Sequence, residues 1–190
     1  MAGILYGATA QSAWGQDRRE RALVYRTLGK TGIRVPVIGM GILSAGTPAL
    51  MRAALDAGIT HFDSTAAQPQ QTNNEKMIGE VLKERPRESF IYGTKVHLPQ
   101  NYQTGLYANA ATEQEFTRIL DVALQNLQMD YVDIAYHHMV SRRASAFHEP
   151  AMNAMVKARD AGKARFLGSP RTATCRRQST RPWTQGFTRW

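Results

Sequence analysis

Short apolar segments that are typical of strands alternate strictly with longer segments of helical periodicity along most of this chain. A strand that returns through a helix lies parallel to the strand before it, so this order predicts an α/β fold with a parallel sheet. Turn and cap signals separate the segments. The expected strands are residues 37–40, 59–62, 90–96, 131–136 and 164–167, and the expected helices begin near residues 47, 73, 112 and 150.

Local signals set several of these boundaries. A Lys-Thr-Gly turn at residues 30–32 indicates a small hairpin before the first strand. Thr47 followed by proline is a typical helix start, and Asn73 or Asn74 is expected to cap the second helix. Thr112 and Glu115 match a capping box, followed by an apolar stripe from position 116 to position 127. The helix after Thr112 is therefore the best supported of the four.

The sequence divides into a flexible leader at residues 1–24, one folded domain at residues 25–168 and an irregular basic tail at residues 169–190. The tail contains five arginines and no acidic residue, so it carries most of the net charge of +9. A nucleic-acid-binding function needs a basic surface on the fold itself and is therefore disfavoured. The single cysteine, Cys175, excludes an intramolecular disulfide.

The N-terminal residues are compatible with two cellular compartments. Residues 1–10 are small and mildly apolar, as in the end of an export signal, but no basic segment precedes them. We therefore expect a cytoplasmic protein, with export as the alternative. No apolar run approaches the roughly 18 residues that span a bilayer, so no membrane partner is expected.

Two parallel architectures compete for this pattern. Gly39-Met-Gly41 follows a strand and Asp63 lies 22 residues beyond Gly41, which is similar to the phosphate loop and ribose-binding acid of a Rossmann-type dinucleotide-binding domain. Ser44 occupies the third glycine position, and the helix begins late, at Thr47. The alternative is a (β/α)8 TIM barrel, in which chemistry collects at the C-terminal ends of the strands.

Three ionisable residues fall at such strand ends in successive units: Asp63, Lys95 and His138. An acid, an amine and an imidazole that meet at one rim are suited to lower the pKa of a neighbour and to donate a proton to a carbonyl oxygen. Neighbours on a strand point to opposite faces, so His137 is expected to face the helices. For the same reason we expect no metal site shared by His137 and His138.

Six segments together resemble the aldo-keto reductase family, in that family's order and over about residues 25–168. They are YRTLGKTG at 25–32, AGITHFD at 57–63, NEKMIG at 74–79, TK at 94–95, DYVDI at 130–134 and GKARFLG at 162–168. The resemblance implies a barrel whose base is closed by an N-terminal hairpin. It also implies an oxidoreductase that reduces small aldehydes and ketones with NADPH.

The same resemblance assigns the catalytic residues. Asp63 corresponds to the aspartate that orients a lysine, and Lys95 to the lysine that lowers the pKa of a tyrosine acid. His138 corresponds to the histidine that orients the substrate carbonyl and relays the proton.

Three further positions match residues that contact the cofactor in this family. Gly41 and Ile42 match the loop after the first strand, which faces NADPH. Ser169 matches a serine that contacts the nicotinamide amide.

The tyrosine acid itself is missing. The family places it five residues after the aspartate, where this chain has Gln68. A glutamine amide donates a hydrogen bond but has no titratable proton to give. Tyr92 lies three residues from Lys95 on a strand and is expected to face the other side. Tyr102 and Tyr107 belong to a loop near the expected site, but the sequence does not assign either of them the role of the acid. Because the tyrosine acid is missing, we expect poor activity from this chain.

The sequence also predicts only part of a barrel. Five strands and four helices are expected, where the full fold has eight strands in roughly 250 residues. Open strand edges would then favour self-association. One choice among the possible codons for residues 169–190, read one base out of frame, spells a capped helix that leads into a strand, similar to the family at that point, so we expect a frameshift after Gly168. A non-catalytic barrel fragment is the alternative function.

Overall fold

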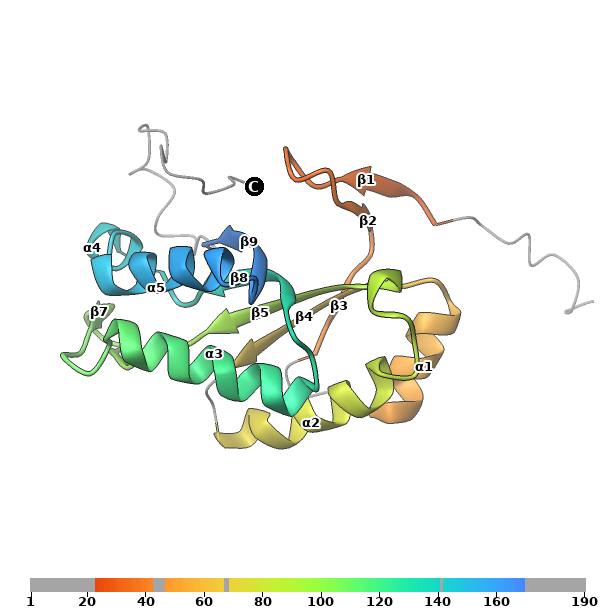
Figure 1. Ribbon diagram of the computed structural model, residues 1–190, viewed down its shortest axis with the longest axis horizontal. Coiled ribbons are helices and arrows are strands. Elements are labelled where there is room, and N and C mark those ends of the chain that lie inside the picture. Colours follow the sequence, from red (N-terminus) through yellow and green to blue (C-terminus); the bar gives the residue numbers. More distant parts are fainter. Residues whose placement is uncertain (1–22, 43–46, 67–68, 141, 170–190) are drawn as a thin grey trace, which may run out of the picture.

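The structure is a computed structural model that describes residues 23–42, 47–66, 69–140 and 142–169. Gln68, most of the leader and the tail from residue 170 lie outside this part of the chain. The centre of the fold is a parallel sheet in which the strands lie side by side in the order of the sequence (Figure 1). Its strands are β3 (Met40–Gly41), β4 (His61–Ala66), β5 (Ile91–Val96), β8 (Val132–His137) and β9 (Ala164–Gly168).

This strand order decides between the two architectures. In a doubly wound fold the order reverses at a switch point, and a ligand binds at that crevice. Here each strand pairs with the next one in sequence and all pairs are parallel, as in a barrel. The Rossmann-type alternative is therefore wrong, and the predicted partial barrel with its N-terminal hairpin is confirmed.

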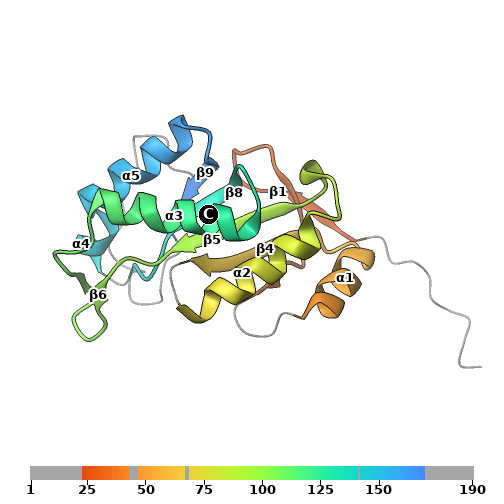
Figure 2. The ribbon, with the colours of Figure 1, turned by 60° about the horizontal axis from the view of Figure 1, so that its bottom comes forward.

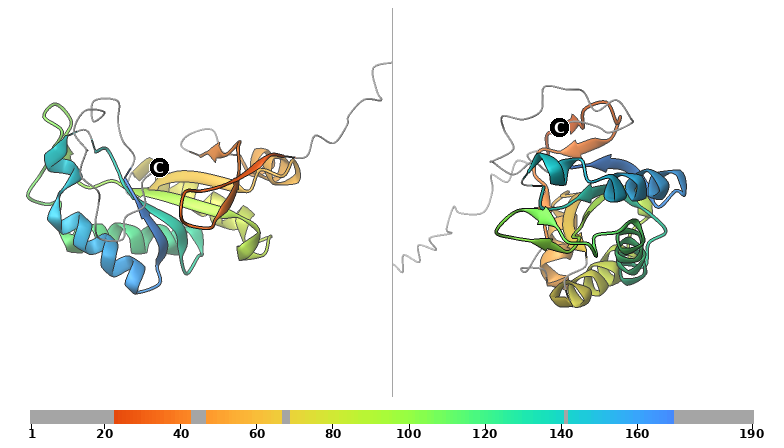
Figure 3. Two further views of the ribbon diagram at one scale, coloured as in Figure 1. Left: turned by 90° about the horizontal axis from the view of Figure 1, so that it is seen from above. Right: turned by 90° about the vertical axis from the view of Figure 1, so that its left-hand side faces the viewer.

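The helices cover one side of the curved sheet and the hairpin lies on the other side (Figure 3). Figure 2 shows α2 and α3 side by side across that helical side. The core between helices and sheet is apolar and includes Phe62, Ile78 and Leu120, which are at most 1% exposed. The helices are α1 (Pro48–Asp56), α2 (Pro69–Leu82), α3 (Glu113–Leu127), α4 (Arg143–Ala146) and α5 (Glu149–Asp160), with a 3-10 turn at Arg87–Ser89.

Two short antiparallel pairs complete the described part of the chain. The first is the predicted hairpin, formed by β1 (Tyr25–Thr27) and β2 (Arg34–Pro36). The second, β6 (Gln100–Asn101) with β7 (Leu106–Tyr107), lies in the segment that we expected to be a simple loop. This second pair carries two tyrosines to the C-terminal end of the sheet.

Helix starts agree with the caps in two cases. The Thr47 hydroxyl accepts the Leu50 amide at 3.2 Å, and the Thr112 hydroxyl accepts the Glu115 amide at 3.1 Å. The predicted cap of α2 at Asn73 or Asn74 is wrong, because α2 already begins at Pro69. Proline is favourable at a first helical position, where no amide donor is needed.

Two strands also differ from their predicted bounds. Val37 and Ile38 were expected in a buried strand but are 51% and 55% exposed, because the Val37 amide bonds to the Val24 carbonyl and so extends the hairpin. Strand β4 continues to Ala66, since β5 offers a partner to each of its residues. Asp63 therefore lies within β4 rather than after it. No helix of the described residues is long and apolar enough to cross a membrane.

Candidate active site

The structure brings Asp63 and Lys95 together as an ion pair. They lie on adjacent strands, and Nζ of Lys95 contacts Oδ2 of Asp63. The Lys95 ammonium also lies 3.4 Å from the Ser64 carbonyl. The side chains of Lys95 and Asp63 are 20% and 34% exposed, so the pair is only partly shielded from water. A positive charge is thus held at a position that a small molecule is able to reach.

Gly93 makes room for this arrangement. A Cβ at Gly93 would lie 3.3 Å from Oδ1 of Asp63 and 3.0 Å from Cε2 of Tyr136. Tyr136 is in register with Lys95 on the neighbouring strand, and Nζ of Lys95 lies 5.7 Å from the centre of its ring. Burial, assisted by the negative charge of Asp63, raises the pKa of Tyr136. Oδ1 of Asp63 is buried and has no hydrogen-bond partner among the described residues.

His138 follows β8 and is held through its backbone. Its amide donates to the Val96 carbonyl at 3.1 Å, and its carbonyl accepts the Tyr107 hydroxyl at 3.0 Å. Burial, together with the nearby His97 and the charge of Lys95, lowers the pKa of His138 to about 4. The imidazole is therefore neutral at pH 7 and carries a single proton.

His137 and Tyr92, which we expected to face away from the site, do lie away from the ion pair. His137 is 2% exposed, and the Tyr107 hydroxyl lies 2.5 Å from its Nε2. Burial lowers the pKa of His137 to about 3. Tyr92 is fully buried and its hydroxyl donates to the Ser64 hydroxyl at 2.6 Å. Neither side chain is available to a substrate at the Asp63–Lys95 pair.

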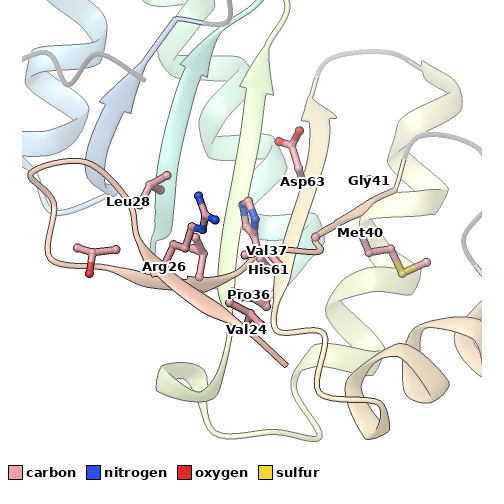
Figure 4. A pocket seen from close by; sticks show the side chains of 12 residues that line it. Val24, Arg26, Leu28, Pro36, Val37, Met40, Gly41, His61 and Asp63 are labelled. Atoms are coloured by element: carbon pink, nitrogen blue, oxygen red, sulfur yellow. The ribbon is translucent and has the colours of Figure 1, made fainter. Parts of the chain in front are cut away.

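A cavity of about 910 Å³ lies between the hairpin and the sheet (Figure 4). Gly41 and Asp63, which are paired in the sheet, line its wall at the C-terminal end of β3. His61 lies on the same face two residues before Asp63, and burial lowers its pKa. The hairpin contributes the opposite wall, through residues such as Arg26 and Leu28.

The three positions matched to cofactor contacts differ in accessibility. Gly41 has open space in front of it, since an added Cβ would meet no atom within 4 Å. Ser169 is half-buried and directly follows β9. Ile42 is fully buried, its amide donates to the Asp63 carbonyl at 2.8 Å, and its carbonyl accepts the Asn74 side chain at 2.9 Å. Of the two paired residues that line the cavity, Gly41 thus leaves open space in front of its backbone, next to Asp63.

Sequence reasoning missed two residues of this site, His97 and Tyr136. Each lies two positions from a residue that it singled out, His97 after Lys95 and Tyr136 before His138. Alternation along a strand places residues two apart on the same face, so this spacing was a usable signal.

The fold and the charged strand ends define a barrel-type α/β protein with a polar site at the C-terminal ends of its strands. Residues 41–174 match the model of the aldo/keto reductase family. The chain belongs to this family.

Curated relatives of the chain are oxidoreductases. It is 30% identical over 156 residues to an L-glyceraldehyde 3-phosphate reductase of Escherichia coli (strain K12), covering 76% of this chain and 44% of that protein. It is 31% identical over 156 residues to an L-galactose dehydrogenase of Arabidopsis thaliana, covering 75% and 47%. The chain thus spans about half the length of the curated relatives it matches.

Solved structures agree with this assignment. An aldo-keto reductase from Bacillus halodurans in its holo form superposes with a TM-score of 0.65 and 25% identity, covering 78% of this chain and 50% of that one. A thermostable aldo-keto reductase in complex with the inhibitor epalrestat superposes with a TM-score of 0.63 and 27% identity, covering 77% and 53%. The likeness covers more than three quarters of this chain and about half of each relative.

Proposed function

We propose that this chain carries the proton-handling part of a site that reduces small aldehydes and ketones with NADPH. The observation that carries the proposal is the Asp63–Lys95 ion pair, which a small molecule is able to reach. His138 follows the neighbouring strand β8, close enough for the charge of Lys95 to help lower its pKa. The names of its relatives, a reductase and a dehydrogenase, support the same class of reaction.

Each residue has a distinct part in this reaction. NADPH, when bound, would supply the hydride that reduces the carbonyl carbon, and Gly41 and Ser169 are the accessible residues that would hold its nicotinamide. Lys95 stabilises the negative charge that develops on the carbonyl oxygen, because its cation is already held in position before the charge develops. Asp63 holds the Lys95 ammonium in place, and the singly protonated His138 donates to the oxygen.

The reaction is expected to be slow in the 190-residue chain. Gln68 stands where the family has a tyrosine acid, and loss of a general acid removes a factor of roughly 10²–10⁴. In the described part of the chain, the wall of the cavity opposite the sheet is formed by the hairpin. Substrate and cofactor are therefore less firmly positioned, which lowers the rate further.

A single-turnover isotope experiment tests the proposal at such low rates. The purified chain, in excess over NADPH labelled with deuterium at the transferable position, is incubated with a panel of aldehydes that includes glyceraldehyde 3-phosphate. Mass spectrometry then measures deuterium in the alcohol product. We expect label above the buffer background, reduced about 100-fold in Lys95→Met.

Lys83→Met serves as the matched control. Lys83 directly follows α2, is exposed, pairs with Glu80 and is not among the residues that line the cavity. It should leave the label unchanged. Transfer that survives Lys95→Met would contradict the role of the ion pair in the reaction. A complete lack of labelled product in the parent chain would favour the alternative of a non-catalytic fragment.

A further inference from the structure

A chain of hydrogen bonds leads from His138 to the protein surface. The Tyr102 hydroxyl lies 2.7 Å from Nε2 of His97, and Nδ1 of His97 lies 3.2 Å from Nδ1 of His138. The rings are also in contact, since His97 stacks on Tyr102 and meets His138 edge to face. Tyr102 is 66% exposed, so the outer end of this chain is open to water.

The surrounding structure holds all three side chains in place. His97 follows β5, two residues beyond Lys95, and His138 is fixed through the two backbone hydrogen bonds described above. Tyr102 lies in the turn between β6 and β7. There the Asn101 side chain accepts the amides of residues 103 and 104 at 2.9 and 3.0 Å, which orders the turn.

The two histidines must share one proton between their facing nitrogens. Burial lowers the pKa of His97, and His138 is neutral as well, so each ring carries one proton at pH 7. If the Tyr102 hydroxyl donates to Nε2 of His97, then His97 carries its proton on Nδ1 and donates it to Nδ1 of His138. His138 then carries its own proton on Nε2, at the far side of the ring. This arrangement presents His138 as a proton donor.

We infer that Tyr102 and His97 are positioning residues that set the tautomer of His138 and resupply its proton. They would thereby take over the task of the tyrosine whose place Gln68 occupies. The inference rests on the proposed carbonyl reduction and adds to it the route by which the proton arrives. Tyr136 is the other phenol near Lys95, and among the described residues its hydroxyl has no hydrogen-bonded connection of this kind.

The proton transfers balance as follows. When hydride has reached the carbonyl carbon, the oxygen takes the proton from Nε2 of His138. Nδ1 of His138 takes the proton from Nδ1 of His97, and Nε2 of His97 takes the proton from the Tyr102 hydroxyl. The exposed Tyr102 oxygen then regains a proton from water. These transfers leave the proton of His138 on Nδ1 and that of His97 on Nε2, so both rings return to their starting tautomers by exchanging ring protons with water before the next turnover. The net result is one hydride from NADPH and one proton from solvent added to the carbonyl.

Nuclear magnetic resonance of the chain labelled with 15N in its five histidines tests the tautomers without any substrate. We expect the proton of His97 on Nδ1 and that of His138 on Nε2. Tyr102→Phe removes the donor and should shift His97 toward the Nε2 tautomer. Tyr131→Phe removes the same atom at the N-terminal end of β8, where the ring lies 4.0 Å from the Arg87 guanidinium, and should change neither histidine.

The single-turnover deuterium assay then tests the functional consequence. Tyr102→Phe should lower the rate about tenfold to 100-fold with little change in the substrate concentration at half-saturation, because proton supply rather than binding is affected. His97→Gln breaks the chain one step further in and should give a similar loss. Tyr131→Phe should react like the parent.

The outcomes separate this inference from the proposed function. His97 protonated on Nε2 in the parent chain overturns the relay whatever the activity. Two results would overturn the relay but leave carbonyl reduction in place. One is labelled product that depends on Lys95 but not on Tyr102 or His97. The other is labelled product that is lost only in Tyr136→Phe. Absence of any labelled product overturns the proposed function, and the relay as its proton route with it.

Discussion

At the scale of single residues, one buried carboxyl group stands out from the candidate site. Glu75 on α2 is 3% exposed. The Asn126 side chain donates to its Oε2 at 3.0 Å, but Oε1 has no partner among the described residues. Burial raises the pKa of Glu75 above its ordinary value of 4.5. A buried carboxylate that is only half satisfied lowers the stability of the fold.

Glu75 makes the stability depend on pH. Its raised pKa means that the folded state holds this proton more tightly than the unfolded state. Its contribution is therefore most favourable below the unfolded pKa and declines as pH rises through the folded value. Glu75→Gln removes the charge and keeps the acceptor for Asn126, so it should raise the free energy of unfolding at pH 7 by about 1–2 kcal/mol.

Urea unfolding of the parent chain and of Glu75→Gln from pH 4 to pH 8 measures the difference in their free energies of unfolding. This difference should shrink toward pH 4. Glu88→Gln, an exposed glutamate of the 3-10 turn, is the control and should change little. A less stable Glu75→Gln protein at pH 7 would show that the carboxylate has a partner that stabilises it.

At the scale of elements, the packing of α2 on α3 depends on a glycine. A Cβ at Gly79 would lie 2.5 Å from the Leu127 carbonyl oxygen and 2.9 Å from that of Asn126, both backbone atoms at the end of α3. These helices pack along the same face of the sheet (Figure 2). The backbone atoms have no freedom to turn aside, so a side chain at position 79 would force the helices apart.

Gly79→Ala should therefore destabilise the protein by about 1–3 kcal/mol. This sign is opposite to that expected from helix propensity, by which alanine is about 1 kcal/mol better than glycine. Thermal or urea unfolding measures the effect. Asn73→Ala, at an exposed position of the same helix, reports propensity alone and should be neutral or slightly stabilising. Equal effects at the two positions would contradict the close approach of the helices.

At the scale of the whole molecule, the sheet is open at both sides in the part of the chain that the structure describes. β3 pairs only with β4, and β9 pairs only with β8. β9 is the longer of these edges, and its Phe166 is half-buried. Unpaired strand edges with apolar side chains favour association with another chain.

We therefore expect the 190-residue chain to associate with a second copy through β9. Analytical ultracentrifugation should show an average mass that rises with concentration. Phe166→Glu, which places a charge on this edge, should shift the chain toward monomer. Val122→Glu adds the same charge to α3, at an apolar residue that is 40% exposed, and should leave the association unchanged. A monomer at all concentrations, or equal effects of both variants, would exclude association through β9.

Much of this protein follows from its sequence because the controlling interactions are local. The alternation of strands and helices and the threonine caps at Thr47 and Thr112 depend on neighbours in the chain. Asp63 and Lys95 lie on successive strands of the sheet as predicted, although Asp63 lies within β4 rather than after it. Six segments similar to the aldo-keto reductases also allowed the family to be predicted from the sequence. Boundaries were less predictable, because β4 extends only where β5 provides partners.

The tertiary structure alone decided which side chains meet. Strand order excluded the doubly wound fold, although both folds share the same alternation along the sequence. Register set Tyr136 beside Lys95, and the β6–β7 turn brought Tyr102 to His97 and thereby to His138. Such contacts join residues of different elements through the geometry of the sheet and of a loop, which no local pattern in the sequence specifies.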